Sequence, residues 1–194
     1  MKTFTILIAA FLLLTVNSYG QWVQWTRNYS LDSLDYSSVS FYDKLTGFVT
    51  TPFPDTKLLK STDGGISWTE VNVPDPLNQI SYAEMSDENT VWIVMNESPV
   101  LSVGANICKS DDGGDTWEVM FETNDGIREL FILDENHLWA GTGTRLVYST
   151  VDGGQTWTES EQLEMSLIHD MYFVNPDTGW ATGGGTKDVI ERTT

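Results

Sequence analysis

Ser61-Thr-Asp-Gly-Gly-Ile-Ser-Trp68 is one of three nearly identical eight-residue segments in this chain of 194 residues. The other two read Ser110-Asp-Asp-Gly-Gly-Asp-Thr-Trp117 and Thr150-Val-Asp-Gly-Gly-Gln-Thr-Trp157. Their central aspartates, at positions 63, 112 and 152, are 49 and 40 residues apart. A segment that recurs at such intervals indicates an internal structural repeat. We call the three segments the first, second and third box.

The recurring positions of the box suit a tight turn between two strands. The Asp carboxylate can accept backbone N–H bonds, and glycine adopts positive φ without a Cβ clash. The Ser or Thr hydroxyl can bind the loop, and the Trp can bury a large ring on the returning strand. We therefore interpret these residues as structural, and we assign no catalytic, cofactor-binding or metal-binding residue. The structural set is Ser61, Asp63, Gly64, Gly65, Trp68, Ser110, Asp112, Gly113, Gly114, Trp117, Thr150, Asp152, Gly153, Gly154 and Trp157.

Apolar columns upstream of each box extend the repeat. An aromatic column comprises Phe48, Trp92, Trp139 and Trp180, and a second apolar column seven residues earlier comprises Phe41, Met85, Ile132 and Phe173. Short segments rich in β-branched and aromatic residues predict strands, and no segment outside the first twenty residues has a helical period. The predicted strands are Ser38–Phe41, Gly47–Thr51, Val91–Met95, Glu129–Leu133, Arg145–Thr150 and Met171–Val174.

Each unit thus contains a strand, a turn, a strand, a loop, a strand, a box and a final strand. Four strands in about 40–45 residues is the size of one propeller blade. The sequence therefore predicts an all-β fold, a β-propeller of four-stranded antiparallel blades with about four units. The units span about 25–68, 69–117, 118–157 and 158–194.

The two ends of the repeat leave two arrangements open. Trp25-Thr26 resembles Trp68-Thr69, the start of the strand after a box, and Ile190-Glu-Arg-Thr-Thr194 matches Leu58-Leu-Lys-Ser-Thr62. We expect a partial propeller, cut within its fourth unit. Alternatively, a strand at residues 22–29 completes the last blade and closes a four-bladed ring, which would hide sheet edges.

The first twenty residues predict a secretory signal peptide. Lys2 precedes an apolar run, Phe4 to Val16, and Ser18-Tyr19-Gly20 supplies small residues at a cleavage site. We expect a secreted or cell-envelope protein in which residues 21–194 carry the repeats. No later stretch is apolar enough to span a membrane. Residues 21–194 have nine basic and twenty-eight acidic side chains, a net charge of −19. This charge excludes nucleic acid as a partner.

Few residues carry recognisable chemistry. Cys108, the only cysteine, directly precedes Lys109-Ser110, in the strand that the repeat places before the second box, and we expect a buried thiol. Because the chain has only two histidines, His137 and His169, and one cysteine, we expect no zinc site. Ser166 near His169-Asp170 lacks the motif of a catalytic triad. Four arginines, none in the phrase typical of sialidases, argue against that enzyme. A pair of carboxylates for glycoside hydrolysis is harder to exclude.

Glu129 and Asp170 are the pair considered for that hydrolysis. They occupy similar places at the starts of their repeats, where a propeller strand lines the central channel. We interpret them as acids at a solvated rim, because a chain with twenty-eight acidic side chains always offers some pair. The segment Asp111-Asp-Gly-Gly-Asp115 lacks the ordered ligand spacing of an EF-hand loop, so we expect no calcium site there.

All three boxes resemble the Asp-box, or BNR repeat, of the form Ser/Thr-x-Asp-x-Gly-x-Thr/Ser-Trp. The unit around them resembles the photosystem II assembly and stability factor family of propellers, as in Gly47-Phe-Val49 and Gly179-Trp-Ala181. Val91-Trp-Ile93 and Leu138-Trp-Ala140 fit the pattern without the Gly. The resemblance covers Trp25 to Thr194 and implies a β-propeller of an exported bacterial type, with a possible secretion-sorting domain beyond Thr194.

The resemblance leaves function open, because sialidases, xyloglucan-cleaving glycosidases and sortilin-type receptors also carry the box away from their active sites. Our leading hypothesis is a non-enzymatic, exported propeller that binds or scaffolds an unidentified protein or glycan, without a cofactor. Loops that differ between units, at residues 51–56 and 96–106, are the expected contact surfaces. The alternative is part of a carbohydrate-active hydrolase, sialidase-like or xyloglucanase-like.

Overall fold

The computed structural model describes residues 36–75, 78–97, 103–160, 162–185 and 188–193. Within these ranges the chain forms fifteen strands and no helix. The predicted signal peptide at 1–20 and the strand predicted at 22–29 lie outside the described residues. In the described part of the chain, no helix is long and apolar enough to cross a membrane.

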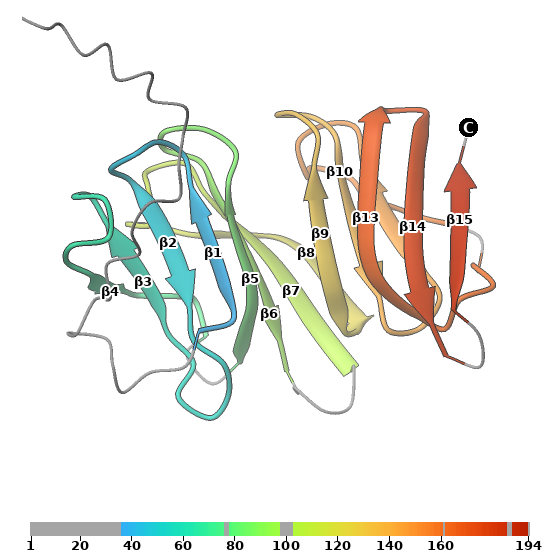
Figure 1. Ribbon diagram of the computed structural model, residues 1–194, viewed down its shortest axis with the longest axis horizontal. Helices are drawn as coiled ribbons and strands as arrows, with labels where there is room; N and C mark the ends of the chain where they lie inside the picture. Colours follow the sequence, from blue (N-terminus) through green and yellow to red (C-terminus); the bar gives the residue numbers. More distant parts are fainter. Residues whose placement is uncertain (1–35, 76–77, 98–102, 161, 186–187, 194) are drawn as a thin grey trace, which may run out of the picture.

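The strands form four antiparallel sheets, each built from consecutive strands (Figure 1). We call these sheets blades 1 to 4. Blade 1 contains β1 (Ser38–Phe41), β2 (Gly47–Thr50), β3 (Leu58–Ser61) and β4 (Thr69–Val71). Blade 2 contains β5 (Gln79–Met85), β6 (Val91–Asn96), β7 (Val103–Ser110) and β8 (Glu118–Asp125). Blade 3 contains β9 (Ile127–Ile132), β10 (Leu138–Thr142), β11 (Val147–Thr150) and β12 (Thr158–Glu159). Blade 4 contains β13 (Leu167–Asn175), β14 (Thr178–Gly184) and β15 (Val189–Thr193).

This arrangement confirms the predicted all-β fold of antiparallel propeller blades. Each box joins the third strand of a blade to its fourth, so a blade ends one strand after its box. Four of the six predicted strands match an observed strand closely, with β1 at the predicted bounds, and Met171–Val174 lies within the longer β13. The exception is the strand predicted from Arg145, because β11 begins at Val147 and Arg145 lies in the preceding turn with φ 76°. There the Thr142 hydroxyl accepts bonds from the N–H groups of Thr144 and Leu146 and holds the turn closed.

The core lies between neighbouring blades, and the two predicted apolar columns meet there. Phe48 of blade 1 packs in one buried cluster with Met85 of blade 2. Trp139 of blade 3 stacks on Phe173 of blade 4, with ring centroids 3.8 Å apart. In blades 1 to 3 the aromatic ring therefore packs on the first strand of the following blade. Burial of this apolar surface is the main force that holds the blades together.

A buried side chain also joins blade 2 to blade 3 by hydrogen bonds. The Asn96 amide nitrogen donates to the Ile127 carbonyl over 2.8 Å, and the Asn96 amide oxygen accepts from the Ile127 N–H over 2.9 Å. Both residues are buried, so unpaired groups here would destabilise the fold. Asn96 thus pairs with the start of β9 as a neighbouring strand would.

Blades 1 and 4 lie at opposite ends of a row of four (Figure 1). The described residues therefore form an open row, in agreement with a partial propeller. The alternative ring closed by residues 22–29 depends on a segment outside the described ranges.

Candidate functional site

The side chain of the Asp closes each box from within. In the first box, Asp63 Oδ1 accepts from the Ser67 N–H over 2.9 Å, and Oδ2 accepts from the Ser67 hydroxyl over 2.6 Å. Asp112 and Asp152 make the same two bonds to Thr116 and Thr156. These bonds to the charged carboxylate, led by the one from the Ser or Thr hydroxyl, lower the pKa of all three aspartates to about 2.

A buried hydroxyl completes the same turn. Ser110 Oγ donates to Asp112 Oδ1 over 2.7 Å and accepts from the Gly114 N–H over 2.8 Å. Ser61 and Thr150 make the corresponding bonds in the other two boxes. The glycines after each Asp all have positive φ, between 69° and 95°. The Asp carboxylate and the Ser or Thr hydroxyl of each box are thus hydrogen-bonded within the same turn.

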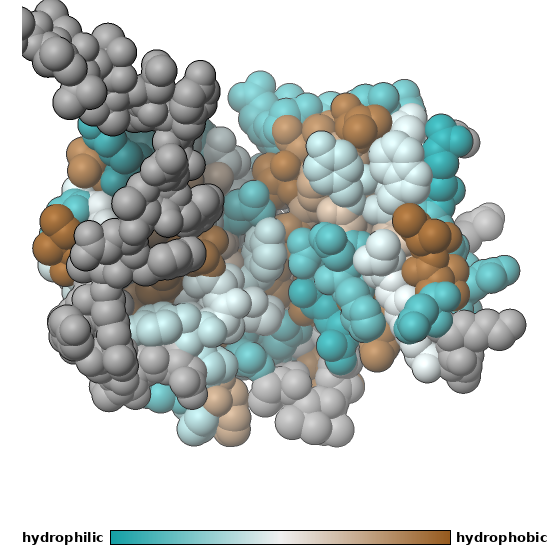
Figure 2. All heavy atoms as spheres, viewed as in Figure 1, coloured by the Kyte–Doolittle hydropathy of each residue, from teal (hydrophilic) through white to brown (hydrophobic). Residues whose placement is uncertain are grey.

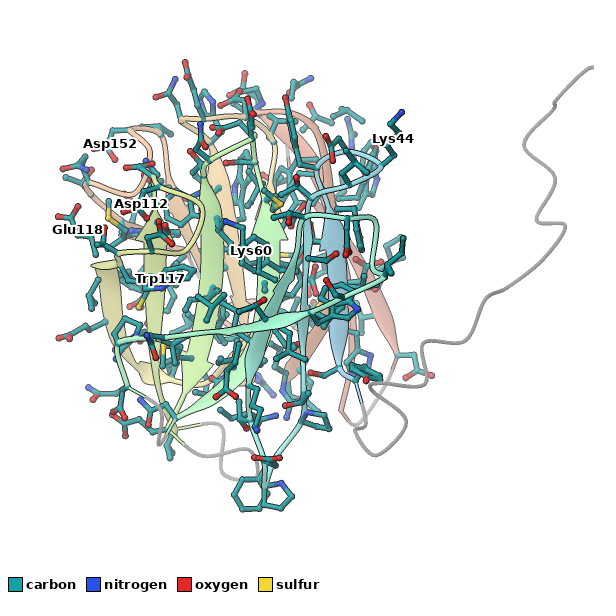
Figure 3. All side chains as sticks on the ribbon, turned by 90° about the vertical axis from the view of Figure 1, so that its left-hand side faces the viewer. Lys44, Lys60, Asp112, Trp117, Glu118 and Asp152 are labelled. Atoms are coloured by element: carbon teal, nitrogen blue, oxygen red, sulfur yellow. The ribbon has the colours of Figure 1, made fainter. Side chains whose placement is uncertain are left out.

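The tryptophans show one difference between the boxes. The indole N–H groups of Trp68 and Trp157 donate to the carbonyls of Gly65 and Gly154 in their own boxes, each over 3.1 Å. Trp117 instead donates to the Asn72 carbonyl of blade 1, over 2.9 Å. Figure 3 shows the second and third boxes on one side of the molecule, with Lys60 near them. Lys60 donates to the Gly113 carbonyl over 2.6 Å, so the second box is bound to blade 1 at two points.

A different set of residues lies on the first strands of blades 2, 3 and 4. Glu84 on β5, Glu129 on β9 and Asp170 on β13 are close enough for their charges to interact, and we call them the inner carboxyl cluster. Burial raises the pKa of Glu129 to about 7, with repulsion from Asp170 and Glu84 adding to the effect. Burial also raises the pKa of Glu84, which accepts a 2.7 Å bond from the Tyr82 hydroxyl.

The inner carboxyl cluster has a group suited to acid–base chemistry, which the boxes lack. A carboxyl group that titrates near neutral pH can give or take a proton in catalysis. The structure brings Glu129 and Asp170 into electrostatic contact, as their places in the repeat suggested, although Asp170 is exposed. Sequence reasoning missed Glu84 and Tyr82. Strand register could have found them, because Glu84 faces Trp92 of the aromatic column across β5 and β6.

The other residues weighed from the sequence do not form a site. His137 Nδ1 lies 2.8 Å from Asp134 in an exposed turn. Ser166 donates its hydroxyl to the Gly184 carbonyl. Cys108 is fully buried, as predicted, and burial raises the pKa of its thiol to about 11. Among the described residues, no three His, Cys, Asp or Glu side chains are placed to hold a metal ion.

An exposed aromatic residue lies on the loop between β2 and β3. The loop is closed by a 3.0 Å bond from the Thr51 N–H to the Lys57 carbonyl, and the buried Thr51 hydroxyl binds Asp55 and Lys57 from within. Pro52 and Pro54 flank Phe53, whose side chain is 63% exposed. The loop is one of the two expected from the sequence to contact a partner, although Phe53 itself was not singled out.

The fold and these geometries define the class of the protein as a β-propeller. No family model matches the chain, and no curated protein matches it. Among solved structures, the chain is similar to an ancestral GH74 enzyme with a TM-score of 0.60 and 17% identity, covering 76% of this chain and 22% of the enzyme. At that identity, the likeness shows the fold alone.

Two further similar structures are those of YCF48 and of a glycosidase. YCF48 from Cyanidioschyzon merolae has a TM-score of 0.37 and 16% identity, covering 83% of this chain and 80% of that protein. The GH93 α-L-arabinofuranosidase of Fusarium graminearum has a TM-score of 0.49 and 16% identity, covering 83% of this chain and 62% of the enzyme.

Proposed function

We propose that the chain is an exported, non-enzymatic β-propeller that binds a protein or glycan as part of an assembly. The observation that carries the proposal is the exposed Phe53 on the loop between β2 and β3. In this loop the Thr51 hydroxyl donates to the Asp55 carbonyl and accepts from the Lys57 N–H. An aromatic ring on an ordered loop loses little conformational entropy on binding, and such rings dominate protein and sugar contacts. The resemblance of the boxes to BNR repeats and the predicted signal peptide support the exported type.

The geometry of the boxes agrees with a binding role. Their carboxylates and hydroxyls are bonded within the turn, so the residues that recur along the chain serve the fold. The candidate contact surface therefore lies on loops that do not recur. The loop that carries Phe53 has this property, since the corresponding loops of blades 2 and 3 differ in sequence and length.

A glycoside hydrolase is the second candidate, favoured by the pKa of about 7 at Glu129 beside Asp170. A carboxyl group with a raised pKa could protonate a leaving group while a second, ionised carboxylate assists on the other side of the bond. This mechanism requires a sugar to reach both groups at once.

One set of assays separates the two candidates. The purified chain is tested for turnover of aryl glycosides and of xyloglucan and arabinan, and for binding to the same polysaccharides and to surface-displayed peptide libraries. The binding proposal predicts no turnover, and a contact that Phe53→Ala weakens about tenfold or more. Tyr42→Ala, which removes another exposed ring of blade 1, is the matched control. Turnover that disappears in Glu129→Gln would establish the hydrolase instead.

A further inference from the structure

The junction between blades 1 and 2 differs from the junction between blades 2 and 3 at one side chain. Phe121 on β8 lies four residues after the box Trp, and Asn72 holds the same position just beyond β4. The ring of Phe121 stacks on Trp157 of the third box, with ring centroids 5.0 Å apart. Asn72 carries no ring, and Trp117 of the second box instead donates its indole N–H to the Asn72 carbonyl. The second and third boxes therefore pack differently on the blades before them.

The different position of Trp117 leaves one carbonyl of the second box without a protein partner. In the third box, the Trp157 indole donates to the Gly154 carbonyl over 3.1 Å. Gly114 is the equivalent of Gly154 and is buried, but none of the described residues donates to its carbonyl. Buried backbone carbonyls are almost always bonded to protein, to water or to a ligand. The Gly114 carbonyl is therefore available to a bound molecule.

Gly114 lines a cavity of about 240 Å³ between blades 1 and 2. Small-molecule sites in proteins usually measure about 300–1,000 Å³, so this cavity has the size for one small ring rather than for a chain segment. In Figure 3, Lys60 of blade 1 lies next to the second box, which is marked by Asp112 and Trp117. No residue of the described loop between β2 and β3 lines the cavity, so it is separate from the contact proposed above.

The walls of the cavity are mainly polar and carry charges of both signs. Blade 1 contributes the Lys60 ammonium group, the Glu70 carboxylate and the Asn72 side chain, and the second box contributes the Asp115 carboxylate. Hydroxyl groups of the first box and of β4 complete the polar lining. On the face shown in Figure 2, by contrast, exposed apolar side chains lie in separate patches with hydrophilic ones between them. A ligand of this cavity must therefore be held by hydrogen bonds more than by apolar contact.

The charges of the walls favour a neutral ligand. Glu70 and Asp115 repel an anion, and Lys60 repels a cation. Lys60 is held in place, because its ammonium group donates to the Gly113 carbonyl over 2.6 Å and lies 5.7 Å from the centroid of the Phe48 ring. The ammonium group retains further donors, whereas the two carboxylates only accept. Hydroxyl groups satisfy both kinds of partner, because each can donate and accept.

We propose that this cavity binds one residue of a neutral saccharide. The hydroxyl groups of the sugar donate to the Gly114 carbonyl and to the Glu70 carboxylate, and accept from Lys60. Asn72 keeps the cavity open, since the ring of Phe121 at the same position of the next junction holds the box Trp near its own glycine. The site is additional to the contact proposed for the loop between β2 and β3.

Titration calorimetry with the purified chain tests the proposal. The probes are neutral tetrasaccharides built from glucose, xylose, mannose, galactose or arabinose, with tetragalacturonate as an anion and spermine as a cation. We expect one site for at least one neutral tetrasaccharide, and binding of the charged probes that is weaker by about tenfold or more. A chain that binds none of the neutral probes overturns the proposal, and so does a chain that binds a charged probe as tightly.

Asn72→Phe should close the cavity in the way the next junction is closed. The new ring can stack on Trp117, whose indole then donates to the Gly114 carbonyl. We expect affinity for the bound tetrasaccharide to fall about a hundredfold or more, with a urea midpoint at or above that of the parent chain. The matched control is Val119→Phe, which adds a ring at an exposed position of β8 and should bind like the parent chain. Binding that survives in a folded Asn72→Phe variant overturns the proposal.

A second pair of variants tests one hydrogen bond of the cavity. Glu70→Ala removes an acceptor from the wall and should weaken binding about tenfold. Glu118→Ala, at an exposed acid of β8 outside the lining, is the control and should bind like the parent chain. This pair decides the question if Asn72→Phe lowers the urea midpoint, and equal affinity of the two alanine variants overturns the proposal. All of these variants retain Phe53, so this proposal and the proposed function can fail independently.

Discussion

The boxes and the inner carboxyl cluster are two sets of polar residues with opposite behaviour along the chain. The boxes keep the same hydrogen bonds of the Asp and of the buried Ser or Thr in three copies, and each holds its aspartate at a pKa of about 2. At the register position of Glu129, on the first strands, blade 1 has Ser38, blade 2 has Tyr82 and blade 4 has Asp170.

The difference follows from what each set must satisfy. A turn with two glycines at positive φ needs the same donors and acceptors wherever it occurs, so its residues recur. A first strand needs apolar residues on the face toward the preceding blade, and its other face is less constrained. In this chain, residues that recur in every box therefore have structural roles, and residues that change from blade to blade are the candidates for function.

The largest effect should come from filling the space above a box glycine. A Cβ at Gly154 would lie 2.9 Å from the Trp92 ring of blade 2, whereas at Gly65 the nearest atom belongs to Trp68 of the same box, at 3.3 Å. Both glycines have positive φ, 89° and 83°. We expect Gly154→Ala to cost about 2–4 kcal/mol and Gly65→Ala about 1 kcal/mol, measured by urea unfolding. Equal losses of unfolding free energy in the two variants would show that the contact of Gly154 with Trp92 of blade 2 adds nothing to stability.

Removing the buried hydroxyl of a box should have the next largest effect. Ser110→Ala leaves the buried Gly114 N–H without its acceptor, which we expect to cost about 1–3 kcal/mol of unfolding free energy. Ser110→Thr is the control, because Thr150 makes the equivalent bond in the third box over 2.9 Å. It should lie within about 0.5 kcal/mol of the parent chain. An alanine variant as stable as the threonine variant would contradict the role of the hydroxyl.

The smallest effect concerns Glu129 and depends on pH. Its pKa is raised from 4.5 to about 7, so the folded state binds more protons than the unfolded state between these values. Stability should therefore fall as pH rises from 4.5 to 7, and this contribution is absent in Glu129→Gln. Because Glu129 is partly exposed, solvent screening limits the gain of the variant above pH 7 to about 1 kcal/mol.

Urea midpoints across this pH range provide the measurement. Glu88→Gln, in an exposed turn after β5, is the control and should track the parent chain. Identical pH profiles for Glu129→Gln and the parent chain would show that the inner carboxyl cluster does not perturb Glu129. The boxes give the opposite dependence, since protonation of Asp63, Asp112 and Asp152 should destabilise the fold as pH falls from about 4 toward 2.

Most of the fold could be predicted from particular residues. The aromatic column and the column seven residues before it predicted two strands per blade, and Phe48 and Trp139 lie in the blade contacts. Arg145 was placed on a strand because local sequence does not reveal that the Thr142 hydroxyl closes the preceding turn. The hydrogen bond from the Trp117 indole to the Asn72 carbonyl could not be predicted either, because it joins residues of different blades.

The sequence by itself determined the blades, because the recurrence of box, turn and apolar column reflects bonds formed within one repeat. Tertiary structure decided which acids meet and which apolar residues remain exposed. Glu84, Glu129 and Asp170 come together only when blades 2, 3 and 4 stand in a row, and burial then raises the pKa of Glu129. Leu58 and Ile190 occupy the same place in the repeat, but a following blade covers the first and none of the described residues covers the second.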